Sequence, residues 1–291
     1  MPDTEMKTPH FDHVLIVGLG LIGGALAYRI RDIFPDTKLY ALARRQETVD
    51  EAMASGLFEQ ATTRLSDITA PIDLAIICVP IPQVVPMVEA VSAHFTHPMV
   101  ITDVASVKEK LIAELDKRKI REDHTVIWGH PMAGSEKTGF ANAKAVSVEK
   151  RPYIVVPIKD SRFEHFVKWI ADLGFQPARM FAADHDRLVA VMSHVPYIRN
   201  TLYTENVARS EDAEEICKTA GPGFFETIRR AGSDPDWGVQ IAQYNSENIL
   251  KSLEALHQRD ALLIQIIKEK NWDALEAMLK TAKSFKDASP A

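Results

Sequence analysis

The stretch "WGHPMAGSEKTGF", residues 128–140, places a histidine beside a proline at the end of a predicted buried strand. His130 follows the apolar run "TVI", and the glycines and Pro131 keep the stretch out of regular structure. Pro131 restricts the backbone of His130 to extended conformations and so helps to fix its direction. A histidine with a pKa near neutrality can accept a hydroxyl proton while a hydride leaves the same carbon. His130 is therefore a candidate catalytic base of a redox reaction.

Ser106, in "TDVASVKEK", is a second catalytic candidate, from a neighbouring strand end. Its hydroxyl could hydrogen-bond the imidazole of His130 and set its tautomer. It could equally be the N-cap of the helix that follows, because serine is a favoured cap and Glu109 stands at the capping-box spacing. The two roles are compatible, and the spacing favours the cap.

Two further segments carry candidate polar groups in the second half of the chain. "MSHVPY" places His194 just before a helix proline, where a histidine could also be a satisfied residue beside a kink. "ETIRRAGSDPDW" places Arg229 and Arg230 next to a turn. Either arginine could grip a substrate carboxylate, although a surface ion pair is the commoner role of an arginine.

The stretch "VGLGLIGGALA" has the spacing G-x-G-x-x-G, follows a strand and opens a helix, which is the context that this motif requires. Gly18 allows the tight turn, Gly20 the close approach of a pyrophosphate, and Gly23 the packing of helix on strand. The helix N-terminus then presents unpaired N–H groups to the anion. The motif predicts a dinucleotide site with contacts from Gly18, Gly20, Leu21, Ile22 and Gly23.

The end of the second strand, "ALARRQ", indicates which dinucleotide binds. An NAD site has Asp or Glu there, whereas this chain has Ala43 followed by Arg44 and Arg45. Two guanidinium groups are suited to a 2′-phosphate, so the sequence predicts NADP. The alternative is that both arginines are solvated loop charges.

Short apolar runs alternate with helical patterns through the first half of the chain, which favours a parallel sheet with helices on both faces. In such sheets ligands bind beyond the carboxyl ends of the strands, so Val79, Pro80 and Asp103 are also predicted cofactor contacts. The predicted strands are 13–18, 38–43, 73–80, 99–104, 125–129 and 153–157, with a possible last strand at 175–181, and the predicted helices between them are 22–34, 46–55, 82–95, 106–119 and 161–173.

After Phe181 the sequence is helical, with one long helix that contains Pro196, a short helix ending at Gly232, a long amphipathic helix over 234–271 and a last helix from Trp272. We therefore expect a Rossmann-type α/β dinucleotide-binding domain over residues 1–181. An all-α domain over residues 182–291 follows, and its apolar stripe is suited to packing against a second copy of the chain.

The composition of the chain limits its partners and its cellular location. The 291 residues are 46% hydrophobic and 25% charged, with net charge −6, which is typical of globular domains. No long basic block indicates nucleic acid or an anionic membrane surface as a partner. Cys78 and Cys217 form no disulfide framework or zinc pattern. No signal peptide or membrane span is recognisable, so we expect a cytoplasmic protein.

In this order, "VGLGLIGG", "TDVASVK", "GHPMAGSEKTG", "SHVP" and "IRRAGSDP" resemble the prephenate/arogenate dehydrogenases of tyrosine biosynthesis. The resemblance covers about residues 13–250. It implies oxidative decarboxylation of a cyclohexadienyl substrate: a hydride leaves C4, the C4 hydroxyl is deprotonated, and the C1 carboxylate is lost as CO2. It also implies a homodimer formed through the helical domain.

The resemblance also assigns roles to residues. His130 would deprotonate the C4 hydroxyl, and Ser106 would support His130 and the nicotinamide. Arg229, five residues before Asp234, would bind substrate carboxylate in preference to Arg230. His194 and Ser135 would contact substrate.

Tyr197 is a departure from the family pattern, since many members have a second histidine there. Together with the arginines after the second strand, it favours arogenate over prephenate, and an amino-substituted prephenate is a further possibility. Two other functions stay open. One is a β-hydroxyacid dehydrogenase-like oxidoreductase, in which the "HPMAG" loop would have no role. The other is a redox sensor that binds NADP without turning it over.

Overall fold

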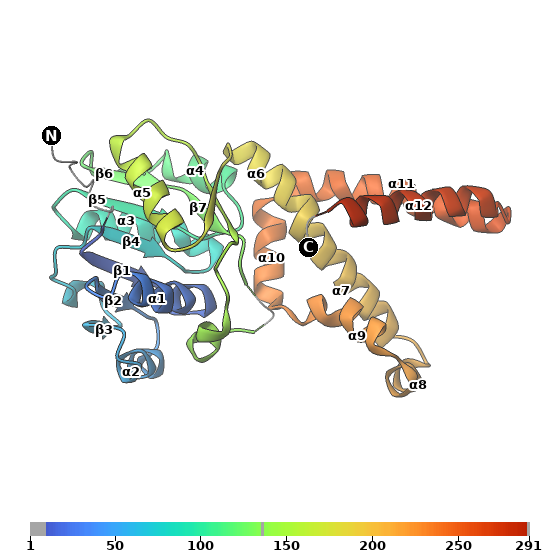
Figure 1. Cartoon of the computed structure of the whole chain (residues 1–291), viewed down its shortest axis with the longest axis horizontal. Coiled ribbons are helices and arrows are strands. Elements are labelled where there is room, and N and C mark those ends of the chain that lie inside the picture. Colours follow the sequence, from blue (N-terminus) through green and yellow to red (C-terminus); the bar gives the residue numbers. More distant parts are fainter. Residues whose placement is uncertain (1–9, 135–136, 290–291) are drawn as a thin grey trace, which may run out of the picture.

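The near-continuous apolar runs of the first half form a parallel six-stranded sheet in the order β3-β2-β1-β4-β5-β6. The computed structural model describes residues 10–134 and 137–289 (Figure 1). Five of the six strands were predicted, and the short β3 was not. The strands are β1 (His13–Val17), β2 (Lys38–Leu42), β3 (Gln60–Thr62), β4 (Leu74–Ile77), β5 (Met99–Asp103) and β6 (His124–Ile127).

Both faces of this sheet are covered, which explains why its strands are apolar at successive positions rather than at alternate ones. Val14 and Ile16 pack in one core with α1, α2 and α5, whereas Leu15 and Val17 pack in a second core with α3 and α4. The helices are α1 (Leu21–Ile33), α2 (Gln46–Ala54), α3 (Val84–His94), α4 (Glu109–Leu115) and α5 (Ser161–Asp172), with short 3-10 turns at Leu65–Asp67, Ile81–Gln83 and Phe140–Ala145.

The predicted strand at 125–129 is in fact divided between two sheets. β6 ends at Ile127, and β7 (Gly129–Pro131) begins a small sheet with β8 (Pro152–Val155) and β9 (Gln176–Arg179). β7 runs antiparallel to β8, so these strands lie outside the parallel sheet that the alternation predicted. Gly129 permits the crossing, because a Cβ there would lie 2.7 Å from the Tyr153 ring.

The helix predicted around Pro196 is continuous but contains a π-helical turn. α6 (Ala182–Val189) passes through this turn (Ala190–His194) into α7 (Val195–Ala208). Proline lacks the N–H donor and its ring crowds the carbonyl four residues earlier, and the wider turn accommodates both effects. The later elements are α8 (Ala213–Thr219), α9 (Pro222–Ile228), a 3-10 turn (Arg229–Gly232), α10 (Pro235–Tyr244), α11 (Ser246–Lys268) and α12 (Trp272–Ala288).

The prediction of one long helix over 234–271 is wrong. The helical conformation is interrupted at Asn245, which separates α10 from α11. The Asn245 side chain turns inward and donates to the Asp186 carbonyl at 2.8 Å. This hydrogen bond stabilises the non-helical backbone conformation of Asn245.

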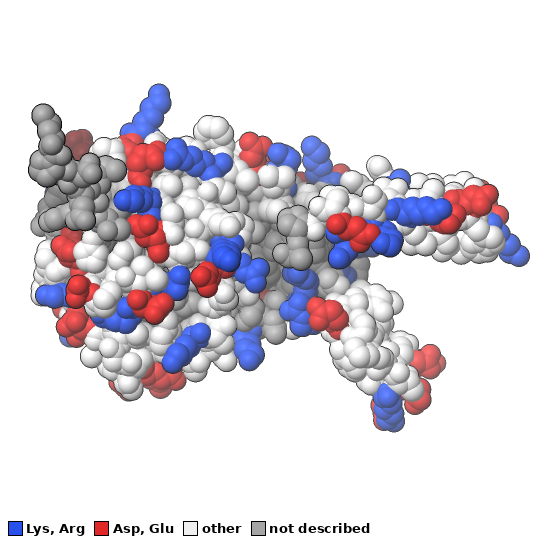
Figure 2. Space-filling model, viewed as in Figure 1, with Lys and Arg blue, Asp and Glu red and all other residues white. Residues whose placement is uncertain are grey.

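α11 and α12 form a hairpin that projects from the rest of the chain (Figure 1). Among the residues described, none of the helices is long and apolar enough to cross a membrane. In the view of Figure 2, basic and acidic side chains are interspersed over the sheet-containing half. The hairpin exposes the large apolar side chains Leu250, Leu256, Leu262, Ile264, Ile267, Trp272, Leu279 and Phe285.

Candidate active site

The glycine-rich turn between β1 and α1 has the geometry that its sequence predicted. Gly18 has a φ of +95°, and a Cβ there would lie 2.4 Å from the Cys78 carbonyl oxygen. A Cβ on Gly23 would lie 2.3 Å from the Gly18 carbonyl oxygen. The positive φ and the close carbonyl oxygen therefore exclude a side chain at Gly18, and the close carbonyl oxygen alone excludes one at Gly23.

Gly20 differs from its neighbours because a Cβ there would meet no atom within 4 Å. Gly20 is also the N-cap of α1 and supplies no side-chain bond to the first N–H groups of the helix. Leu21 and Ile22, in the first turn of α1, are half-buried. An open space in front of uncapped N–H groups fits the pyrophosphate of a dinucleotide.

The end of β2 presents two basic side chains. Ala43 is buried, whereas Arg44 and Arg45 are exposed. Neither guanidinium group makes a hydrogen bond or ion pair within residues 10–134 and 137–289. Both are therefore available for a phosphate group.

The predicted cofactor contacts at the other strand ends have different environments. Val79 packs against the glycine turn, with Cγ1 3.1 Å from a Cβ placed on Gly18. Pro80 is exposed before the 3-10 turn at Ile81–Gln83. The carboxylate of Asp103 is buried, and both of its oxygens accept internal hydrogen bonds.

Asp103 organises the two loops that carry the catalytic candidates. Its Oδ1 accepts the Gly129 N–H at 3.1 Å, beside His130. Its Oδ2 accepts the Ala105 N–H at 2.9 Å and the Lys108 ammonium at 2.6 Å. Lys108 is 0% exposed and also donates to the Ala105 carbonyl. Asp103 thus joins the loop after β5, through Ala105 and Lys108, to the start of β7 at Gly129.

His130 lies on β7 and is only 9% exposed. Its Nδ1 lies 2.9 Å from Nε2 of His185, and the His185 Nδ1 lies 2.7 Å from Oδ1 of Asp186. His185 and Asp186 belong to α6 and are fully buried. No hydrogen bond to Nε2 of His130 comes from the described residues.

Ser106 fills neither of its two predicted roles. Its Oγ is buried and has no hydrogen-bond partner among the described residues, so it contacts neither His130 nor the helix that follows. That helix is shorter than predicted and begins at Glu109. The Asp186 carboxylate caps it instead, accepting from the N–H groups of Lys108 at 2.8 Å and Glu109 at 2.9 Å. An unpaired buried hydroxyl fits a contact with a bound ligand.

Burial favours the neutral form of the histidines in this region. It lowers the pKa of His130 well below the ordinary value, and the neighbouring His185, Lys108 and His194 lower it further. Burial also lowers the pKa of His185, although the hydrogen bond to Asp186 opposes this. Both imidazoles are therefore neutral near pH 7.

His194 and Tyr197 lie in the helical half, where the two halves of the chain meet. His194 is fully buried, its Nδ1 lies 3.2 Å from the Asn245 amide nitrogen, and its Nε2 has no partner in the described part of the chain. Tyr197 is buried against Trp237 and shares a core with the sheet. Its hydroxyl lies 2.6 Å from a Cβ placed on Gly238, so the tyrosine depends on that glycine.

The remaining predicted substrate contacts are not part of this buried cluster. Arg229 lies in the 3-10 turn that follows α9, is exposed and forms an ion pair with Glu226 at 3.2 Å. Arg230, beside it, is exposed. Ser135 lies outside the described residues.

His185, Asp186 and Lys108 were missed by the sequence analysis. A signal for the first two exists, because each stands four residues before a buried apolar residue, Val189 or Ala190. Titratable residues on the apolar face of a helix must be bonded to other groups in the interior. No comparable signal marks Lys108, since its burial depends on Asp103 and on tertiary packing.

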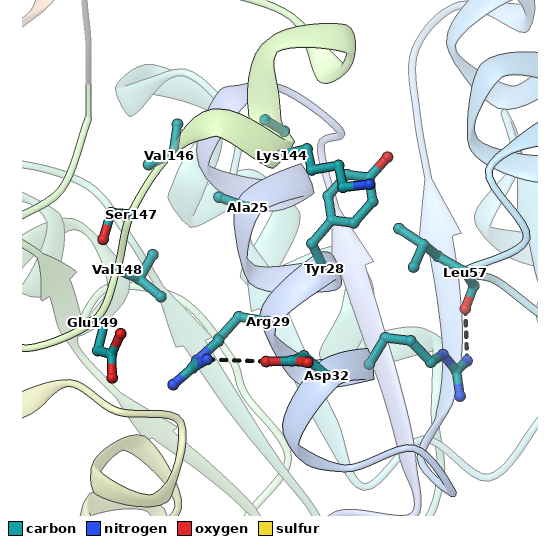
Figure 3. A pocket seen from close by; sticks show the side chains of 12 residues that line it. Ala25, Tyr28, Arg29, Asp32, Leu57, Lys144, Val146, Ser147, Val148 and Glu149 are labelled. Atoms are coloured by element: carbon teal, nitrogen blue, oxygen red, sulfur yellow. Dashed lines mark hydrogen bonds and ion pairs between the residues drawn. The ribbon is translucent and has the colours of Figure 1, made fainter.

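A polar depression of about 620 Å³ lies elsewhere, between α1 and the turn at Phe140–Ala145 (Figure 3). Within it, Arg29 pairs with Asp32 and Arg31 donates to the Leu57 carbonyl. None of the predicted site residues lines it. Its lining residues are Ala25, Tyr28, Arg29, Arg31, Asp32, Leu57, Ala143, Lys144, Val146, Ser147, Val148 and Glu149.

Comparison with known proteins agrees with both halves of the fold. The family model of the prephenate dehydrogenase nucleotide-binding domain matches residues 26–174, and that of the prephenate dehydrogenase dimerization domain matches residues 181–281. The prephenate dehydrogenase of Bacillus subtilis is 27% identical over 96% of this chain and 76% of its own length.

Two solved structures extend this likeness. The arogenate dehydrogenase of Synechocystis is 29% identical, with a TM-score of 0.74, over 94% of this chain and 99% of its own. The prephenate dehydrogenase of A. aeolicus, in complex with hydroxyphenyl propionate and NAD+, is 26% identical, with a TM-score of 0.83, over 95% and 98%.

Proposed function

The chain belongs to the prephenate dehydrogenase family, and on that premise we propose that it catalyses the NADP-dependent oxidative decarboxylation of arogenate or prephenate. The products would be tyrosine or 4-hydroxyphenylpyruvate. The family relationship supports the coarser activity, a dehydrogenase of the prephenate and arogenate type. The single observation that carries the proposal is the buried His130, bonded at one ring nitrogen and unbonded at the other within the described chain.

His130 moves the proton in the proposed reaction. Its imidazole accepts the proton of the C4 hydroxyl while the C4–H bond breaks with its electron pair. The nicotinamide ring, when bound, supplies the acceptor for that hydride. The C1–carboxylate bond then breaks, CO2 leaves, and the electron pair of this bond enters the ring. The ring oxygen takes the proton back from His130, so the aromatic product forms with no net change in protons.

The dinucleotide would be held by the glycine turn and by the two arginines after β2. Gly18, Gly20, Leu21, Ile22 and Gly23 would receive the pyrophosphate. Arg44 and Arg45, exposed and unpaired within the described part of the chain, would bind the 2′-phosphate. Ala43 offers no carboxylate, so the usual partner of an unphosphorylated ribose is missing. Ser106 would contact the nicotinamide side, which would give its buried hydroxyl a partner.

The substrate would be bound by residues of both halves. Arg229 would bind a carboxylate, with His194, Tyr197 and Ser135 lining the site. Tyr197 is buried and uncharged, so it supplies no cation for the 2-oxo acid side chain, and this supports arogenate as the preferred substrate. We also propose a homodimer through the helical half, supported by the apolar side chains exposed on α11 and α12. A cytoplasmic location and the domain boundary at residues 181 and 182 stay predictions.

The experiment that tests this function is a steady-state assay of the full chain by nicotinamide absorbance. Arogenate and prephenate are each combined with NADP and with NAD. We expect the highest kcat/KM with arogenate and NADP, and CO2 released in equal amount to the reduced cofactor. No turnover in any of the four mixtures would refute the function, whereas turnover with NAD alone would refute only the cofactor assignment.

A further inference from the structure

Three side chains from two distant segments form one buried hydrogen-bonded chain. His130 stands on β7, and His185 and Asp186 stand on α6, which belongs to the other half of the fold. The bonded atoms are His130 Nδ1 and His185 Nε2 at 2.9 Å, then His185 Nδ1 and Asp186 Oδ1 at 2.7 Å. Such a chain fixes where its protons lie, because each nitrogen must be either a donor or an acceptor.

The direction of the chain is set at its carboxylate end. Asp186 accepts the N–H groups of Lys108 and Glu109 in addition to the bond with His185. Several donors favour the ionised form of a carboxylate, and an ionised carboxylate can only accept. The Nδ1 of His185 must therefore carry a proton and donate it to Asp186.

The tautomer of His130 follows from that of His185. His185 is fully buried and its pKa is lowered, chiefly by that burial, so a neutral ring with a proton on Nδ1 leaves a lone pair on Nε2. That lone pair accepts the proton on Nδ1 of His130. In a neutral His130, Nε2 is then the unprotonated nitrogen, and no described residue occupies it.

We propose that His185 and Asp186 are positioning residues that hold His130 as its Nδ1–H tautomer, so that Nε2 accepts the proton of the substrate hydroxyl. This inference rests on the proposed function for the identity of the proton donor, but not for the tautomer itself. In the reaction the substrate O–H bond breaks and an Nε2–H bond forms. The resulting imidazolium donates from Nδ1 to His185, whose far side faces the Asp186 carboxylate.

The two halves of the fold must be docked for this arrangement to exist. The Asp186 side chain accepts the backbone N–H groups of Lys108 and Glu109 at the start of α4, and the Asn245 amide donates to the Asp186 carbonyl at 2.8 Å. Asp186 could therefore be no more than a cap for α4. The cap needs only a hydrogen-bond acceptor, whereas the tautomer needs an ionised carboxylate facing His185, and this difference allows a test.

The Asp186→Asn variant separates the two roles. Its amide oxygen, in the place of Oδ2, can still accept the Glu109 N–H at the start of α4. Its NH2 group, in the place of Oδ1, can donate to Nδ1 of His185 and reverse the chain, which places a proton on Nε2 of His130. We expect kcat to fall by about 10²- to 10⁴-fold, the usual contribution of a general base, with KM for NADP unchanged. The matched control is Asp184→Asn on the same helix, because Asp184 is exposed and, among the described residues, pairs only with Arg187. We expect it to keep full kcat.

The tautomer can also be read without turnover, by long-range 1H–15N NMR of the full chain labelled at histidine. The His130 signal is identified by its loss in His130→Asn. We expect a proton on Nδ1 of His130 in the native chain and on Nε2 in Asp186→Asn. A native His130 protonated on Nε2 overturns the inference, as does a folded Asp186→Asn variant with native kcat. The expected tautomer in a chain that turns over no cyclohexadienyl substrate would refute the proposed function alone.

A second pair of variants covers the case in which Asp186→Asn fails to fold. His185→Gln retains a hydrogen-bond acceptor for Nδ1 of His130, whereas His185→Leu removes it. We expect His185→Leu to lose at least tenfold more kcat than His185→Gln, with circular dichroism and NADP binding as checks on folding. Equal losses in the two variants contradict a positioning role for His185.

Discussion

The buried chain of His130, His185 and Asp186 differs from the exposed pair Arg44 and Arg45 in burial and in hydrogen bonding. Each member of the first is inside the protein and hydrogen-bonded to the next. The second pair lies at the end of β2, exposed to solvent and without a partner among the residues described. The hydrogen bonds of the first site exist without a ligand, whereas the two guanidinium groups would gain a partner only from a bound ligand.

This difference follows from the chemistry that each site is proposed to perform. A base must have one nitrogen unprotonated and aimed at the substrate, so its tautomer must be fixed in advance by surrounding groups. A phosphate is recognised by charge and by several equivalent donors, so a flexible guanidinium is sufficient. Substitutions should therefore affect turnover and folding at the first site, and cofactor selection at the second.

The largest effect is expected for His130→Ala. The variant lacks the imidazole, and no other described residue at this position accepts the hydroxyl proton. We therefore expect kcat to fall by about 10²- to 10⁴-fold. Binding of NADP, followed by fluorescence titration, should change by less than about threefold, because the predicted phosphate contacts lie elsewhere. A native kcat in His130→Ala would contradict the assignment of His130 as the base.

The next effect is on folding, in Lys108→Met. This substitution leaves the Asp103 carboxylate buried without its ammonium partner at 2.6 Å. Breaking a buried pair in this way costs about 3–5 kcal/mol, measured as the free energy of unfolding in urea. Lys119→Met, at an exposed position just after α4, is the control and should change stability by less than about 0.5 kcal/mol. The double variant with Asp103→Asn should lose less than the sum of the two single losses.

Arg44→Ala should change cofactor selection while leaving folding unchanged. Hydrogen bonds to a charged group contribute about 1.5–3 kcal/mol, so KM for NADP should rise about ten- to hundredfold and KM for NAD should stay within about twofold. Arg118→Ala on the surface after α4 is the control, because its pairing with Glu89 is exposed. An unchanged NADP/NAD preference in both Arg44→Ala and Arg45→Ala would contradict the cofactor assignment.

The last effect is a pH dependence of stability to which the buried His194 contributes. Burial lowers the pKa of His194 to about 4, so the unfolded chain binds more protons than the folded chain between that value and about 6.5. The contribution of His194 to stability should therefore be constant above about pH 6.5 and decrease below it, by up to about 1.4 kcal/mol per pH unit. Urea unfolding of His194→Gln should show a shallower fall, and Arg44→Ala the native one.

Much of the fold was predictable because it depends on local patterns. The apolar runs, the glycine turn with its positive φ at Gly18, and the amphipathic helices all depend on residues close in sequence. The errors occurred where distant residues intervened. α4 begins later than the Ser106 cap predicted because Asp186, 77 residues from Glu109, is its acceptor. The break at Asn245 is likewise fixed by bonds to Asp186 and His194.

By itself the sequence determined the glycine turn, the basic end of β2 and the histidine placed at a strand terminus beside Pro131, because backbone conformation and exposed charge follow from residue type and spacing. Only the tertiary structure decided that His130 is bonded to His185 and that Asp103 and Lys108 form a buried pair. Burial changes the cost of a charge and of an unpaired hydrogen bond, and burial is a property of all the elements that pack around a residue.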